Sequence, residues 1–242
     1  MPEKKALVNW EEKLAAQATE TAAEERPSIA NISLRGGQMT YEGQPIPNNT
    51  LQCIPIHYAF ENRFYAEKWD PNNIQPPSCY ALAVSEANLA PHENVTEAKN
   101  ETCLGCPMAE WGSSLSGGRG KACSEIRRVL VMPALKELTP ETIAKAEIAM
   151  IRVPVTSVRS WSNFVNTCAA SAKRPPWAMF ATITVVPDAR TQFKMSFEAA
   201  AKVDVELLAA LEARREQLEK VLLAPYGAVS DKQEPTKDSG KY

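Results

Sequence analysis

Four cysteines constrain the central region of the chain more than any other feature. Cys103 and Cys106 form a C-x2-C pair, with one further cysteine before it, Cys79, and one after it, Cys123. A close pair that clamps an ion, together with two distant ligands that close the loops around it, is the ligand pattern of a tetrahedral structural zinc site. The spacing predicts one structural Zn²⁺ bound by these four thiolates, in a subdomain at about residues 78–124.

Other interpretations of the cysteines remain open. A lone C-x2-C pair can be redox-active, although no βαβ pattern surrounds this one. Disulfides are not expected, because residues 1–5 lead into a polar segment rather than a signal-peptide core and thiols stay reduced in the cytosol. Cys53 and Cys168 lie in apolar stretches and are expected to be core residues, while His92 is an alternative metal ligand.

The composition sets the broad class of the protein. The 242 residues, 44% of them hydrophobic, suffice for a sizeable core, and no apolar run approaches the length of a membrane span. We therefore expect no membrane association. The formal net charge of −2 gives no global basic signature, so a nucleic-acid partner would need a local basic groove.

Hydrophobic periodicity predicts a mainly β chain of the α+β class with a helix at each end. Proline and glycine mark many short connections, which favours an OB-like antiparallel β-barrel with the zinc subdomain inserted. The predicted segments are a helix within 1–27, a hairpin at 28–34 and 38–41, a long central strand at 50–65 with a bulge or an exposed edge at Pro55, a short helix opened by Thr139 and Pro140, a helix capped by Thr156 or Ser157, a hairpin at 178–186 and 192–197, and a helix at 203–223. The barrel would span residues 28–227, and the polar residues 228–242 are expected to be a disordered tail.

Catalytic constellations were sought and not found. The chain contains two histidines, of which His57 reads as a sheet residue, and it carries no nucleophile elbow, Walker loop or dinucleotide fingerprint. The glycine-rich run 117–121 lacks the spacing of a phosphate-binding loop. We therefore expect no enzymatic activity.

Basic and aromatic residues gather around the cysteines and just before them. Cations that follow a phosphate backbone, interleaved with rings on which bases stack, are what single-strand binding requires. The expected nucleic-acid contacts are Arg63, Tyr65, Lys68, Trp69, Tyr80, Trp111, Arg119, Lys121, Arg127 and Arg128. Strand alternation further predicts that Tyr58, Phe60 and Phe64 point to one face, with Ala59 and Arg63 on the other.

The motifs C-L-G-C-P, W-G-S and G-K-A-C, within a likeness that runs from about residue 36 to 197, resemble the zinc-containing single-stranded DNA-binding proteins of tailed bacteriophages. The resemblance implies an OB-like barrel whose zinc subdomain helps to coat single strands during replication and recombination in the cytoplasm of the infected bacterium. The resemblance implies that the four cysteines are metal ligands and that Lys121, Arg127 and Arg128 are basic contacts. Such proteins commonly end in an acidic tail that recruits replication proteins, whereas this sequence ends in mixed charge.

A second function from another class fits the same residues. An aromatic surface stabilised by zinc could instead bind a host replication or transcription protein. Single-strand binding should fall steeply with salt and quench tryptophan fluorescence, whereas a protein interface need do neither. Self-association along a strand is compatible with the first function.

Overall fold

The sheet is arranged around one long strand, β4 (Thr50–Phe64). In this computed structural model, β4 pairs antiparallel with β6 (Cys123–Pro133) along most of its length. Its other edge is shared, because β8 (Met179–Asp188) pairs with its first residues and β5 (Cys79–Ala83) with its last. The register between β4 and β6 shifts between Pro55 and His57, which confirms the bulge predicted at Pro55.

The structure describes residues 10, 13–14, 29–67, 75–135 and 137–226. Most of the expected N-terminal helix and all of the expected tail at 228–242 lie outside these ranges. Within the described ranges, no helix has both the length and the apolar character needed to cross a membrane.

One sheet contains all the described strands, in the order β3-β2-β1-β7-β6-β4-β8-β9 with β5 added on β4. Its remaining strands are β1 (Ala30–Ser33), β2 (Thr40–Tyr41), β3 (Gln44–Pro45), β7 (Ala149–Val153) and β9 (Gln192–Lys202). Both predicted hairpins, β1–β2 and β8–β9, are present. The β1–β7 pair is parallel, which departs from the all-antiparallel expectation. Alternation within a strand does not reveal which distant strand will become its neighbour, nor in which direction it will run.

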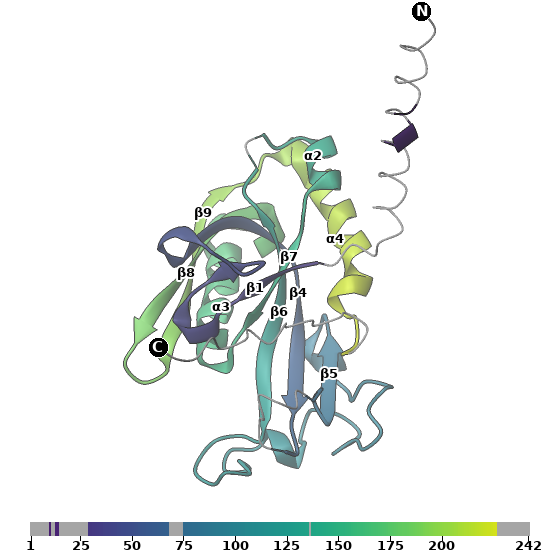
Figure 1. Ribbon diagram of the computed structural model, residues 1–242, viewed down its shortest axis with the longest axis vertical. Coiled ribbons are helices and arrows are strands. Elements are labelled where there is room, and N and C mark those ends of the chain that lie inside the picture. The colour runs from purple at the N-terminus through teal and green to yellow at the C-terminus, as the bar shows by residue number, and fades with distance from the viewer. Residues whose placement is uncertain (1–9, 11–12, 15–28, 68–74, 136, 227–242) are drawn as a thin grey trace, which may run out of the picture.

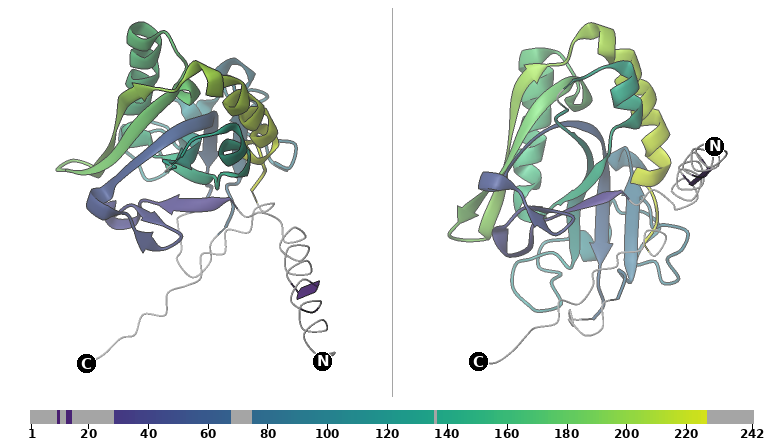
Figure 2. Two further views of the ribbon diagram at one scale, coloured as in Figure 1. Left: turned by 90° about the horizontal axis from the view of Figure 1, so that it is seen from above. Right: turned by 45° about the horizontal axis from the view of Figure 1, so that its top comes forward.

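The sheet curls into a half-barrel, giving a mixed α/β protein dominated by β structure (Figure 2). Helix α3 (Val155–Thr167) packs against β9 and α4 (Leu208–Leu222) against β4. The short helix α2 (Pro140–Lys145) lies beside α4 (Figure 1). The loop between β5 and β6 projects from the opposite end of the sheet (Figure 1).

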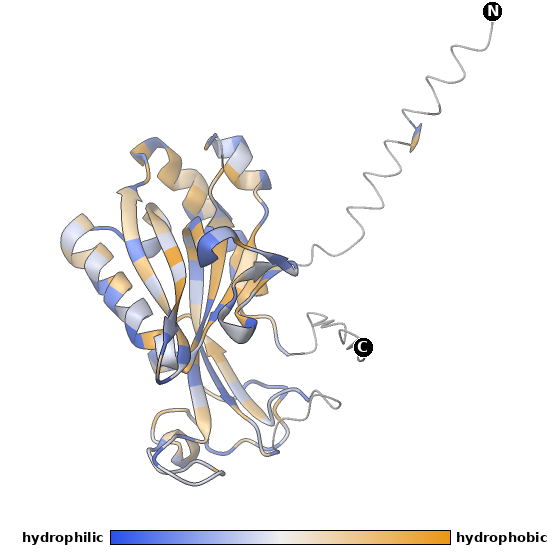
Figure 3. Ribbon diagram, turned by 60° about the vertical axis from the view of Figure 1, so that its left-hand side comes forward, coloured by the Kyte–Doolittle hydropathy of each residue, from blue (hydrophilic) through white to orange (hydrophobic). Residues whose placement is uncertain are grey.

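Both faces of the central strands are buried, as the apolar character of β4 predicted. Cys53 belongs to a core cluster under α3 with Trp161 and Phe164, whereas Ile54 belongs to a second cluster under α4 with Leu211. Figure 3 shows the hydrophobic residues concentrated on these central strands. The fold therefore has two cores that share one sheet, which explains why β4 reads as apolar on both faces.

Helix starts agree with the sequence in one case and differ in two. Thr139 caps α2 with Pro140 at its first position, as predicted. Helix α3 begins at Val155 after Pro154, without a side-chain cap, because Ser157 faces inward and its hydroxyl accepts a hydrogen bond of 2.9 Å from the backbone N–H of Met195. The predicted helix at 203–223 begins as α4 only at Leu208, after a 3-10 turn at Val205–Leu207.

Trp161 provides a stability test of the core under α3. Its ring is 1% exposed and lies edge-on to both Tyr58 and Phe197 at 5.3 Å. We expect Trp161→Ala to lower the free energy of unfolding by about 3 to 5 kcal/mol, because a large cavity replaces these contacts. Urea denaturation is the measurement, and Trp111→Ala, at a position 78% exposed, is the control that should change it little.

Candidate functional site

The four cysteines of the predicted zinc site line one small cavity. Cys79 at the start of β5 and Cys123 at the start of β6 both pair in register with Phe64 of β4, so all three side chains lie on one face of the sheet. The β5–β6 loop brings Cys103 and Cys106 over that face. The enclosed volume is about 20 Å³, room for a single ion or water.

A tight turn presents the two loop thiols. The backbone N–H of Cys106 donates to the carbonyl of Cys103 at 3.3 Å, and the N–H of Cys103 donates to the carbonyl of Leu89 at 3.0 Å. Gly105 closes the turn with φ of +73°, a left-handed conformation that favours glycine. The C-x2-C pair is therefore held by backbone hydrogen bonds.

Burial controls the protonation of these thiols. Burial and, to a smaller extent, the neighbouring cysteines raise the pKa of Cys123 to about 12. Burial is also the largest cause of the raised pKa of Cys103, although a hydrogen bond with Asn62 opposes it. Without a cation in the cavity, both thiols are protonated at neutral pH.

The ligand set fits zinc in its chemistry but is not gathered around one point. Four soft sulfur donors surround one cavity, which is what structural zinc requires. Phe64 separates Cys79 from Cys123, and two strand spacings place their Cα atoms roughly 10 Å apart. Across the described ranges, no three or more His, Cys, Asp or Glu side chains are close enough together to hold an ion as they stand.

The remaining sulfur and imidazole candidates lie elsewhere. All six cysteines are free of disulfides. Cys53 and Cys168 are buried in the core under α3, as expected. His92 stacks on Tyr80 with ring centroids 5.0 Å apart and does not line the cysteine cavity, so its position does not favour the alternative ligand assignment.

Arg128 lies inside the protein rather than on a binding surface. It is 2% exposed, and its Nε donates to the Glu61 carboxylate at 2.9 Å. Its Nη1 donates to the carbonyls of Leu222 and Ala224 at 3.0 and 2.8 Å, so the guanidinium holds the end of α4 on the sheet. We correct the expectation of a nucleic-acid contact accordingly, because these bonds occupy Arg128 internally.

The carboxylate partner of Arg128 is fully buried and remains charged. Burial would raise the pKa of Glu61, but the charges of Arg128 and Arg152 and a hydrogen bond from the Tyr226 hydroxyl outweigh it and lower that pKa. Tyr226 in turn lies edge-on to Tyr80 at 5.0 Å. Tyr80 is therefore a 5% exposed partner of this cluster and not an open stacking surface.

Arg63 and Tyr65 occupy different settings at the end of β4. Arg63 is half-buried, and interactions with Tyr226, Tyr65 and Glu61 raise its pKa despite burial. Tyr65 is 39% exposed.

Arg127 and Lys121, two other expected contacts, each lie beside an aromatic ring. The guanidinium carbon of Arg127 lies 4.1 Å from the ring centroid of Phe60. Lys121 Nζ lies 5.4 Å from the centroid of Trp111 and pairs with Glu125 at 2.6 Å. Arg119 is exposed in the same loop.

The aromatic alternation on β4 is confirmed for its clearest members. The rings of Tyr58 and Phe60 lie on one face with centroids 6.1 Å apart, while Ala59 packs in the core under α4. Lys68 and Trp69, also expected to contact nucleic acid, lie outside the described residues.

A groove that sequence analysis missed lies at an interruption in the sheet. On one edge of β4, β8 covers Thr50 to Cys53 and β5 covers Phe60 to Phe64. Within the described chain, no strand covers that edge over residues 54–59. An open groove of about 760 Å³ lies along this gap, between the segment after α3 and the side of α4.

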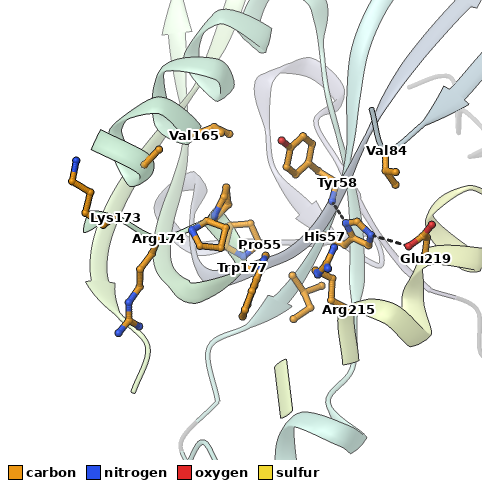
Figure 4. A pocket seen from close by; sticks show the side chains of 14 residues that line it. Pro55, His57, Tyr58, Val84, Val165, Lys173, Arg174, Trp177, Arg215 and Glu219 are labelled. Atoms are coloured by element: carbon orange, nitrogen blue, oxygen red, sulfur yellow. Dashed lines mark hydrogen bonds and ion pairs between the residues drawn. The ribbon is translucent and has the colours of Figure 1, made fainter. Parts of the chain in front are cut away.

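Aromatic rings and cations line this groove together. Tyr58 and Trp177 contribute rings, and Lys173, Arg174 and Arg215 contribute positive charges (Figure 4). The guanidinium carbon of Arg215 lies 5.9 Å from the centroid of Trp177. These residues come from three separate parts of the chain, and the only sequence signal was the local run of basic residues, prolines and tryptophan at 173–177.

His57 and Glu219 add a polar pair to the groove. The Nδ1 atom of His57 accepts a hydrogen bond of 3.0 Å from the backbone N–H of Tyr58, which places the ring proton of the neutral imidazole on Nε2. Burial lowers the pKa of His57, as does the charge of Arg215, although Glu219 opposes the shift. The histidine is therefore neutral at pH 7, with an Nε2–H donor beside the groove.

Comparisons with protein-family models, curated proteins and solved structures gave no match to this chain. Its functional assignment therefore rests on the geometry of the groove, the cysteine cavity and the two cation–aromatic pairs.

The buried ion pair gives a direct test of the role of Arg128. We expect Arg128→Ala to lower the free energy of unfolding by about 3 to 5 kcal/mol, because the Glu61 carboxylate would be left buried without its main partner. Arg119→Ala, which removes the same charge from the exposed loop, should change it by less than about 0.5 kcal/mol. Urea denaturation of both variants is the measurement, and equal stabilities would show that Arg128 is not a structural residue.

Proposed function

We propose that this protein binds single-stranded DNA without sequence specificity, in the groove along the uncovered edge of β4. The observation that carries the proposal is the convergence of Tyr58, Trp177, Lys173 and Arg215 on this groove. Cations that neutralise phosphates, next to rings on which bases stack, are the two requirements of single-strand binding.

The dimensions and charge of the groove support this function. Its volume of about 760 Å³ is in the range of sites that hold nucleotide-sized ligands. Three cations line it against one carboxylate, Glu219, so the site is locally positive although the chain carries a formal charge of −2. This is the local basic groove that the composition required of a nucleic-acid partner.

Two cation–aromatic pairs, Arg127 with Phe60 and Lys121 with Trp111, offer an extension of this path. Phe60 lies on the same face of β4 as Tyr58, and Arg127 covers its ring. A strand leaving the groove along this face would meet Phe60 and Arg127 before it reached the cysteine-bearing loop, which carries Trp111 and Lys121.

Zinc and an OB-like architecture complete the proposal. The curled sheet is compatible with an OB-like barrel, and the four thiols around one cavity supply the donors that a structural Zn²⁺ would take. The β5–β6 loop contains little regular structure and therefore gains little stability from packing. Bound zinc would supply folding free energy in its place. Together with the motif resemblance, this supports a phage protein that coats single strands in the cytoplasm of its bacterial host.

A protein-binding module is the second candidate, favoured by one observation. Leu104, Trp111 and Leu115 are 90%, 78% and 62% exposed in the cysteine-bearing loop. Such apolar side chains suit contact with a replication protein. This function does not explain the cations of the groove, so we place it second.

Oligonucleotide binding tests the principal proposal. We expect titration with oligo(dT) to quench tryptophan fluorescence and the affinity to fall steeply with salt. Lys173→Ala and Arg215→Ala should each reduce the slope of log K against log salt by about 0.7, because each removes one phosphate contact. Lys220→Ala, at an exposed position of α4 outside the groove, is the matched control and should leave the slope unchanged.

Two results would contradict this function. Absence of binding to oligo(dT) at low salt would exclude it, and equal slopes for all three variants would place the strand elsewhere. Far-UV circular dichroism of each variant controls for loss of the fold.

Metal content tests the zinc proposal separately. We expect one zinc per chain in purified protein, and a substantial loss of that zinc in Cys103→Ser. Cys53→Ala and Cys168→Ala, at cysteines outside the cavity, should keep it. A zinc content well below one in the unaltered protein would show that the four thiols do not bind this metal.

A further inference from the structure

His57 is a buried residue that lines the groove. The residue is 7% exposed, and its Nε2 atom makes no hydrogen bond to any described residue. Its other ring nitrogen accepts from the backbone N–H of Tyr58, so the ring is held in place with Nε2–H toward Glu219, which also lines the groove (Figure 4). Buried polar groups are almost always satisfied, so an orphaned donor lining a groove points to a ligand.

Glu219 supplies acceptors beside this donor. Its Oε2 atom lies 3.9 Å from His57 Nε2, too far for a direct hydrogen bond. The carboxylate is about half exposed, extends from α4 and lies next to His57 (Figure 4). The groove thus presents one fixed donor and one two-oxygen acceptor side by side.

Trp177 provides an apolar surface in the same groove. Its indole is partly exposed, and Arg215 lies near its ring. A flat ligand could stack on the indole while its edge faced His57 and Glu219. The chemistry therefore suits a planar heterocycle with two adjacent donors and one acceptor along one edge.

We propose that the groove contains a base-reading subsite that prefers guanine within the bound single strand. In this arrangement, guanine N1–H and N2–H donate to the Glu219 carboxylate, O6 accepts from His57 Nε2–H, and the ring stacks on Trp177. The inference rests on the proposed single-strand function and adds a base preference to one position of the path.

The other bases match this edge less well. Cytosine and adenine each offer one exocyclic amine to the carboxylate and one ring acceptor to the imidazole, which is one hydrogen bond fewer. Thymine offers a single N–H between two carbonyl oxygens, which would face the negative carboxylate. A phosphate group would also be repelled by Glu219 at this position. The expected order is therefore guanine first, cytosine and adenine next, and thymine last.

Oligonucleotides that differ in one functional group test the subsite. The probes are oligo(dT), oligo(dT) with isolated guanines, which avoids quadruplex formation, and the same strand with inosine for guanine, which lacks only the N2 amine. We expect the guanine strand to bind about tenfold more tightly than oligo(dT), and inosine to lose much of that gain. Equal affinities for the three probes would overturn the inference.

The variant Glu219→Gln assigns the preference to this residue. It should lose the preference for guanine over inosine, measured as the ratio of the two affinities. Glu216→Gln, which removes the same charge from an exposed position of α4 that does not line the groove, should keep it. A guanine preference that survives in Glu219→Gln would exclude the subsite.

The outcomes separate this inference from the function on which it depends. If oligo(dT) binds but guanine gives no advantage, only the base-reading subsite fails. If no strand binds, the proposed function fails and the subsite fails with it. Guanosine monophosphate as a competitor distinguishes a strand from a free nucleotide, since its binding as tightly as the guanine oligonucleotide would overturn the assignment to a strand.

Discussion

The division of one edge of β4 between two strands is the constraint on which the rest of the structure depends. Because β8 covers the start of this edge and β5 covers its end, a stretch of backbone between them is left open. The bulge near Pro55 lies within this stretch, and proline has no N–H to leave unsatisfied there. An exposed strand edge is normally a site of unwanted pairing, and here basic and aromatic side chains border it.

The buried Arg128–Glu61 pair connects β6, β4 and the end of α4 beside this gap. Arg128 binds Glu61 of β4 and the carbonyls that follow the end of α4, while Tyr226 connects the same cluster to Tyr80 of β5. Helix α4 also presents Arg215 and Glu219 to the groove. The ion pair therefore fixes the position of one groove wall as well as the strand that leads to the cysteine cavity.

The cysteine cavity and the groove place different demands on the chain. The cavity gathers small thiols on one rigid sheet face and one loop, so a bound ion would order mainly the loop. The groove relies instead on long side chains held by three separate elements, and their positive charges are not balanced within it. The cavity therefore bears on the stability of one end of the sheet, whereas the groove supplies ligand contacts along its edge.

Local pattern predicted several individual elements, including the β8–β9 hairpin, the Pro55 bulge and the Thr139 cap, and it predicted a common site for the four cysteines, which line one cavity. These depend on alternation, turn residues and spacing, which are properties of short segments. Only the tertiary structure decided the parallel β1–β7 pair, the burial of Arg128 and the groove at Trp177 and Arg215. The sequence does not show whether an arginine faces water or a buried carboxylate, because long-range strand pairing decides which of the two it contacts.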